Sequence, residues 1–182
     1  MASCTCVFQQ EGSSGVSGSL KITQDSESSS TVFEGQIRGL SAGQKHGVSV
    51  CTYGDLSGGS ASCGTSFNPF GMHRKFDDCL LQWSLRTNPM LLNVGKTHGA
   101  PGDDPSMRMV GDIGNIVADE AGNAEVKIED SMVKLYGPHS VIGRSIVIFA
   151  GEDDGGKGGQ DKSLTTGNPG PIIAFGVIGL TA

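Results

Sequence analysis

The chain has no long apolar run, no surplus of basic residues and few aromatic residues. No stretch of its 182 residues approaches the roughly 20 apolar residues that a membrane-spanning helix needs. The net charge of −6 argues against nucleic acid or an anionic membrane as the main partner. The start, MASCTCVFQQ, lacks a basic region followed by an apolar one and is not a secretory signal. We therefore expect a cytoplasmic protein that binds neither membranes nor nucleic acid.

The chain has few cysteine residues, and their number is odd. Five cysteines without an export signal predict reduced thiols rather than a disulfide framework. Cys4 and Cys6 form a C-x-C pair that could bind Cu(I) or another soft metal. The alternative is that Cys6 is buried in a first strand and Cys4 lies at the frayed end of that strand.

Glycine is abundant, with 29 residues, and it separates short runs that alternate between apolar and polar residues. These runs predict strands: CTCVFQ, SGSLKITQ, TVFEGQIRGL, HGVSVCTY, NAEVKIED, SIVIFA and IIAFGVIGL. In KHGVSVCTYGD, Val48 and Val50 fall on one face of the expected strand, and Ser49 and Cys51 fall on the other. DEAGNAE is typical of a tight hairpin, because glycine and asparagine tolerate positive φ. The spacing predicts one all-β domain over residues 1–182, a Greek-key barrel or sandwich.

The segment MHRKFDDCLLQWSLRTNPMLLNVG, residues 72–95, has a different pattern. Apolar residues recur there at helical spacing until Asn88-Pro89 interrupts them: Met72, Phe76, Cys79, Leu80 and Trp83. Three interpretations stay open. The segment is a short helix packed on the barrel, an exposed apolar patch for a partner, or a poorly ordered insertion.

Motifs along nearly the whole chain, except Met72–Gly95, resemble the copper/zinc superoxide dismutase family. In order they are GLSAGQKHGVSVCTYGDLSGG, SFNPFG, KTHGAPGDD, MVGDIGNIVADEAGNAEVKIED, LYGPHSVIGRSIVI, DDGGKGG, TTGNPG and GVIGLTA. GDIGNIVAD and HSVIGRS are the most specific of them. The resemblance implies an eight-stranded Greek-key β-barrel, usually dimeric, with metal-binding loops packed outside it.

The resemblance also implies where copper would be bound, and the chain departs from the family there. Ser49, Cys51, Ser66 and Phe149 stand where the family has copper-binding histidines, and the histidine at the position of Ser66 also bridges to zinc. Redox cycling of copper needs imidazoles or comparably strong donors. A neutral hydroxyl is a poor ligand and a phenyl ring has no lone pair, so we expect no bound copper and no catalytic residues.

Other functional positions implied by the resemblance are changed too. Ile172 replaces an arginine that guides superoxide, and Thr165 replaces a lysine above the channel. Phe175 and Ser60 stand at the two half-cystine positions, although Cys63 lies close to the second. A channel without its arginine loses the focusing that makes anion association fast.

The zinc site of the family is half preserved. His98 and Asp112 match two zinc ligands, whereas Met109 and Ser66 replace the other two. Asp153 matches a carboxylate of the family that is not itself a metal ligand and that links the two metal sites. Because two ligands bind zinc weakly compared with a closed four-ligand site, we expect weak zinc binding at most.

His73, in the inserted segment, is a candidate third zinc ligand. Alternatively, His98 is hydrogen-bonded to loop backbone and Asp112 is a turn or cap residue. A further alternative is a superoxide dismutase with a metal site rebuilt from Cys51, His73, His98 and Met109.

Scaffold positions persist. Gly54, Ile142 and Leu180 match positions at the family's dimer interface, and His46 and Arg144 match structural residues. The sequence therefore predicts an inactive superoxide dismutase-like protein that acts as a structural or binding module, as a homodimer or as a heterodimer with an active enzyme. The other hypothesis is a partner similar to the copper chaperone for superoxide dismutase, whose central domain is similar to YGDLSGGSASCG.

Overall fold

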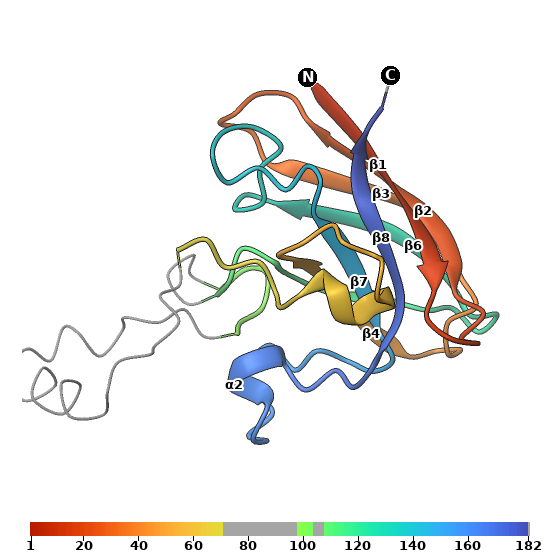
Figure 1. Cartoon of the computed structure of the whole chain (residues 1–182). Coiled ribbons are helices and arrows are strands. Elements are labelled where there is room, and N and C mark those ends of the chain that lie inside the picture. The colour runs from red at the N-terminus through yellow and green to blue at the C-terminus, as the bar shows by residue number, and fades with distance from the viewer. Residues whose placement is uncertain (71–97, 104–107, 182) are drawn as a thin grey trace, which may run out of the picture.

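The computed structural model describes residues 1–70, 98–103 and 108–181, which are almost entirely β structure (Figure 1). Eight strands in this part of the chain pair antiparallel in the order β5-β4-β7-β8-β1-β2-β3-β6. They are β1 (Ala2–Gln10), β2 (Ser17–Gln24), β3 (Thr31–Arg38), β4 (Lys45–Cys51), β5 (Asp112–Val117), β6 (Asn123–Asp130), β7 (Ser145–Phe149) and β8 (Ile172–Leu180). The end strands β5 and β6 contact each other, so the barrel is nearly closed. The predicted all-β Greek-key class is confirmed.

The alternation of side chains decides which face of each strand is buried. In β3, Phe33 and Ile37 are completely buried, while Glu34 and Arg38 between and after them are exposed. Residues of a strand point alternately to its two faces, so this spacing places the apolar side chains in the barrel interior. Each fully buried side chain of this size contributes about 1.5–3 kcal/mol relative to exposure.

Strand β4 differs because both of its faces are covered. Every residue from His46 to Cys51 is buried. Val48 and Val50 belong to the main core, whereas Cys51 belongs to a smaller cluster outside it with Cys63 and Phe175. The predicted faces are correct, and the polar face is buried because loops pack over it.

The structure adds one strand to those that alternation predicts. Strand β5 is short and contains Gly114, whose φ of +87° breaks the regular pattern. The turn predicted in DEAGNAE forms, with the amide of Asn123 donating to Asp119 Oδ1. The hairpin prediction is nevertheless wrong in its pairing. β5 pairs with β4 and β6 with β3, because the turn joins the two ends of the sheet rather than two neighbours in it.

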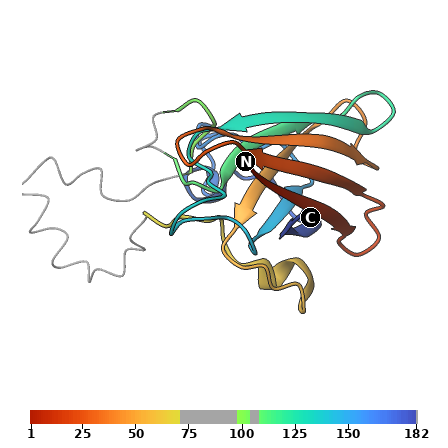
Figure 2. The ribbon, with the colours of Figure 1, turned by 90° about the horizontal axis from the view of Figure 1, so that it is seen from above.

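Helix is limited, in the described segments, to η1 (Gly59–Cys63) and α2 (Ser163–Thr166). Seen from above, η1 protrudes on the side away from β2, β3 and β6 (Figure 2). Nowhere in residues 1–70, 98–103 and 108–181 is a helix long and apolar enough to span a membrane. The helix expected within 72–95, with His73 and Trp83, lies outside the described residues.

Candidate functional site

A cavity of about 520 Å³ lies against the outer face of β4. Its lining includes the positions assigned above to copper, which are Ser49, Cys51, Ser66 and Phe149. The positions associated with zinc, which are His98, Met109, Asp112 and Asp153, line the same cavity. Strands β4, β5, β7 and β8 and the loops between them therefore bring together residues that are far apart in the sequence.

Two serine hydroxyls form the inner wall of this cavity. Ser49 Oγ lies 2.8 Å from Ser66 Oγ and 3.0 Å from the carbonyl oxygen of Gly111, and its single proton can be donated to only one of these two acceptors at a time. Ser66 Oγ in turn donates to Asp112 Oδ1 at 2.9 Å. The two hydroxyls therefore bond to each other and to their surroundings, so they do not stand as free ligands.

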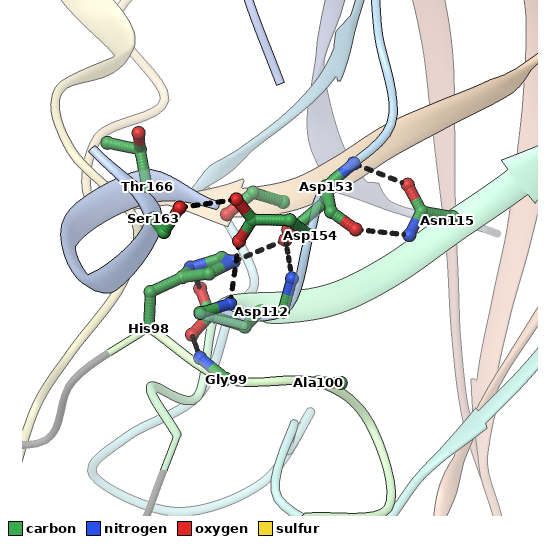
Figure 3. Close-up of polar contacts among 12 residues, drawn as sticks. His98, Gly99, Ala100, Asp112, Asn115, Asp153, Asp154, Ser163 and Thr166 are labelled. Carbon is green, nitrogen blue, oxygen red and sulfur yellow. Dashed lines mark hydrogen bonds and ion pairs between the residues drawn. The ribbon is translucent and has the colours of Figure 1, made fainter. Parts of the chain in front are cut away.

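His98 lies between two carboxylates (Figure 3). Its Nε2 is 2.6 Å from Asp153 Oδ1 in a hydrogen bond, and its Nδ1 is 3.0 Å from Asp112 Oδ1 in an ion-pair contact. All three side chains are at least nine-tenths buried. The two residues predicted as residual zinc ligands are thus adjacent, and both nitrogens of the imidazole already face an acidic oxygen.

The surrounding backbone fixes both carboxylates. Asp112 Oδ2 accepts hydrogen bonds from the amides of Gly99 and Met109, which supply the capping pattern anticipated for an aspartate in a turn. Asn115 clamps the backbone of Asp153 with two hydrogen bonds, visible in Figure 3. Gly167 covers the contact, since a Cβ there would overlap His98 and Asp153. Substitution at Gly167 would therefore disturb the network directly.

The protonation of His98 follows from this placement. Burial alone lowers the pKa of an imidazole, but the contacts with Asp112 and Asp153 outweigh burial and raise the pKa of His98 to about 9. His98 is only 4% exposed, so bulk water screens these contacts little. At neutral pH the site therefore holds an imidazolium between two carboxylates.

This placement predicts a pH-dependent stability for the metal-free protein. The pKa of His98 is raised on folding from 6.5 to about 9, so its contribution is complete below pH 6.5 and is lost as pH rises through 9. That contribution is about 3 kcal/mol. Denaturant unfolding in EDTA from pH 6 to 9 should show this decline, and the His98→Asn variant should lack it. Equal pH profiles for the two proteins would contradict the assignment.

The thiol side of the cavity is apolar and protected. Burial, with a smaller effect from neighbouring Cys63, raises the pKa of Cys51 to about 12. Cys51, Cys63 and Phe175 pack in one buried cluster, and both cysteines are free thiols. Ser60 lies in η1 and carries no sulfur, so it forms no disulfide to the position of Phe175.

Within residues 1–70, 98–103 and 108–181, no group of three or more His, Cys, Asp or Glu side chains is arranged to hold a metal ion. Met109 lines the cavity, but its recorded contact to Asp112 is made by its backbone amide. His73, the candidate third ligand, lies outside the described residues.

His46 and Arg144 both bind backbone. His46 Nδ1 lies 2.9 Å from the carbonyl oxygen of Phe149, so it ties β4 to the end of β7. Arg144 donates to the carbonyl oxygens of Thr52 and Ser140 and lies 3.7 Å above the ring of Phe67. These contacts hold the loop before β7 against the end of β4.

One buried pair near the site was not anticipated from the sequence. Arg108 donates to Asp130 Oδ2 at 2.6 Å and to the carbonyl oxygen of Asp112 at 2.8 Å. It therefore connects the end of β6 to the start of β5, beside the His98 network. The residue order carries no signal for this pair, because Arg108 precedes β5 and Asp130 ends β6, and only the closed barrel brings them together.

A nearly closed Greek-key barrel with a buried histidine and two carboxylates outside one strand defines a superoxide dismutase-like architecture. The chain belongs to the copper/zinc superoxide dismutase family, whose sequence profile matches residues 16–178. It is 44% identical over 171 residues to superoxide dismutase [Cu-Zn] of Saccharomyces cerevisiae, covering 94% of each chain. It is 41% identical over 180 residues to the Cordyceps militaris protein of the same name, covering 99% of each.

Proposed function

We propose that this chain is a superoxide dismutase-like scaffold that does not dismutate superoxide and that acts as a structural or binding module. The observation that carries the proposal is the network Ser49–Ser66–Asp112–His98–Asp153. These polar groups bond to one another where the family resemblance places copper and zinc. The hydrogen bonds and the ion-pair contact between His98 Nδ1 and Asp112 Oδ1 stabilise the buried carboxylates without a metal ion, although His98 Nδ1 itself makes no hydrogen bond within the described part of the chain.

The donor chemistry supports the same conclusion. Copper cycling needs strong donors in both oxidation states. Of the four copper positions, only Cys51 offers one, and burial keeps its thiol protonated at neutral pH by raising its pKa to about 12. For zinc, His98 and Asp112 supply two ligands, so we propose weak zinc binding that a chelator readily reverses.

The charge of the cavity also opposes an anionic substrate. Its described lining contains no lysine or arginine, and Ile172 occupies the position of the guiding arginine. His98 carries the positive charge of the site, and both of its nitrogens already face carboxylates. An anion entering the cavity would therefore meet a net negative charge without a free cationic donor.

Metal content and activity test this proposal together. Protein purified from cells supplied with copper and zinc should hold far less than stoichiometric copper. Its superoxide scavenging should not exceed that of the same amount of free metal. An active family member expressed and loaded in parallel provides the control. Stoichiometric copper accompanied by scavenging well above the free-metal level would overturn the proposal and favour a rebuilt site.

A protein partner is proposed for one end of the barrel. Leu180 is 70% exposed and Tyr53 is 60% exposed. A Cβ on Gly54 would overlap the backbone of Gly143, next to the half-buried Ile142, so these segments are in close contact. An apolar surface of this kind suits a second copy of the chain or a related barrel.

A copper-transfer role is less well supported. Cys4 and Cys6 are both completely buried in the barrel core, so a Cu(I) ion could reach them only if β1 opened. Free thiols at the four described cysteines instead suit a reducing, cytoplasmic environment.

A further inference from the structure

Asp153 has an unused acceptor atom at the cavity. It is only 7% exposed and it lines the cavity. Its Oδ1 accepts from both His98 Nε2 and the amide of Gly155. Asn115 bonds only to the backbone of Asp153. Within the described residues, no donor contacts Oδ2, so a buried carboxylate keeps one oxygen for a ligand.

The charged groups around this oxygen favour a ligand with a positive charge. Asp112 and Asp153 place two carboxyl groups at this side of the cavity, and both nitrogens of the His98 ring between them face these carboxyl oxygens rather than the cavity. Neither lysine nor arginine occurs among the described lining residues. A carboxylate oxygen of a largely buried residue that lines the cavity without a donor gains most from a cationic N–H group, since such hydrogen bonds are the stronger ones.

The apolar lining of the cavity favours a ligand with an apolar surface. Phe149, Ile172 and Leu164 are apolar residues of its lining. The volume of about 520 Å³ lies within the range of small-molecule sites, which are mostly apolar with a few polar groups. The Phe149 ring adds an attractive surface for a cation.

We propose that this cavity binds a small, flat nitrogenous organic cation of the imidazolium type. The N–H of the ligand donates to Asp153 Oδ2, and its carbon face lies against Phe149 and Ile172. The inference rests on the proposed function, because it requires a cavity free of metal. It also predicts that small anions such as formate are excluded.

Imidazole hydrochloride is the probe, titrated at pH 6 into the full chain in EDTA. Amide NMR shifts of Gly155 and Gly167 and calorimetry should both report saturable binding in the millimolar range, which suits so small a ligand. Asp153→Asn should weaken binding at least about tenfold, in line with loss of one charge-assisted hydrogen bond. Glu152→Gln removes the same charge from the neighbouring, exposed residue and should leave the affinity unchanged.

A second variant covers the case in which Asp153→Asn does not fold. Ile172→Arg keeps Asp153 and places a fixed cation at the cavity, so it should reduce imidazolium binding at least about tenfold, as like charges repel. Equal affinity for formate and imidazolium would overturn the inference, as would binding that neither variant changes. Copper uptake with activity in the metal-loading experiment, alongside imidazolium binding in EDTA, would refute the proposed function and leave this inference standing.

Discussion

Replacing Asp130 with alanine is expected to destabilise the barrel by about 3–5 kcal/mol, the cost of breaking a buried ion pair by removing one partner. Arg108 would keep its charge while buried, and the carbonyl oxygen of Asp112 would be its remaining acceptor among the described residues. Asp130 Oδ1 also accepts from the amides of Met132 and Val133, which would lose their partner as well. The variant should have a lower denaturant midpoint with an unchanged slope.

The matched control is Glu129→Ala, because Glu129 is the exposed neighbour of Asp130 on β6. It carries the same charge, so its removal tests for a general charge effect and should change stability little. A second test removes both ends of the pair. The Arg108→Met, Asp130→Leu variant should be more stable than Asp130→Ala, because it leaves no unpaired buried charge. Similar losses for Asp130→Ala and Glu129→Ala would contradict the assigned importance of the pair.

The fold could be predicted from the sequence because its signal is local. Alternation in segments such as TVFEGQIR states directly which side chains face the interior. Strand β5 carries a weaker signal, since Gly114 and Asn115 interrupt a segment of only six residues. The pairing after the turn at Gly122 was mispredicted because local turn chemistry specifies a reversal of the chain and not the neighbour of each strand.

The candidate site could be predicted in part. Family resemblance identified His98, Asp112 and Asp153 individually, and the structure brings them into contact. The alternative that His98 bonds to loop backbone is wrong in its partner, since side-chain carboxylates face both nitrogens. The Arg108–Asp130 pair left no trace in the sequence, because a contact between the segment before β5 and the end of β6 depends on barrel closure.

Asp112 is the most connected residue of the candidate site. Asp112 contacts Ser66, His98 and two backbone amides. A serine at position 66 is short enough to reach both Asp112 and Ser49. A histidine there would extend farther into the cavity, toward a metal ion. The hydroxyls at positions 49 and 66 therefore take part in hydrogen bonds with each other and with Asp112, at positions where the family resemblance implies imidazoles.

Restoring five histidines is expected to have the largest effect on function. The variant combines Ser49→His, Cys51→His, Ser66→His, Met109→His and Phe149→His, which supplies the imidazoles that the family resemblance assigns to copper and zinc. Loaded with both metals, it should bind each near stoichiometrically. Its superoxide scavenging should rise roughly a hundredfold or more over the parent, because the family reaction approaches the diffusion limit when its site is complete. Metal analysis and a superoxide assay measure the two effects.

The control keeps Phe149 and restores the other four histidines. It should bind zinc but hold copper less tightly, because one imidazole donor is missing. Even the five-histidine variant should remain slower than active relatives, since Ile172 provides no charge to attract an anion. Adding Ile172→Arg should increase the rate further, and only that increase should fall steeply with salt, as expected for electrostatic steering. If the folded variant bound both metals and scavenged superoxide no faster than the parent, the five replaced imidazoles would not account for the activity of the parent.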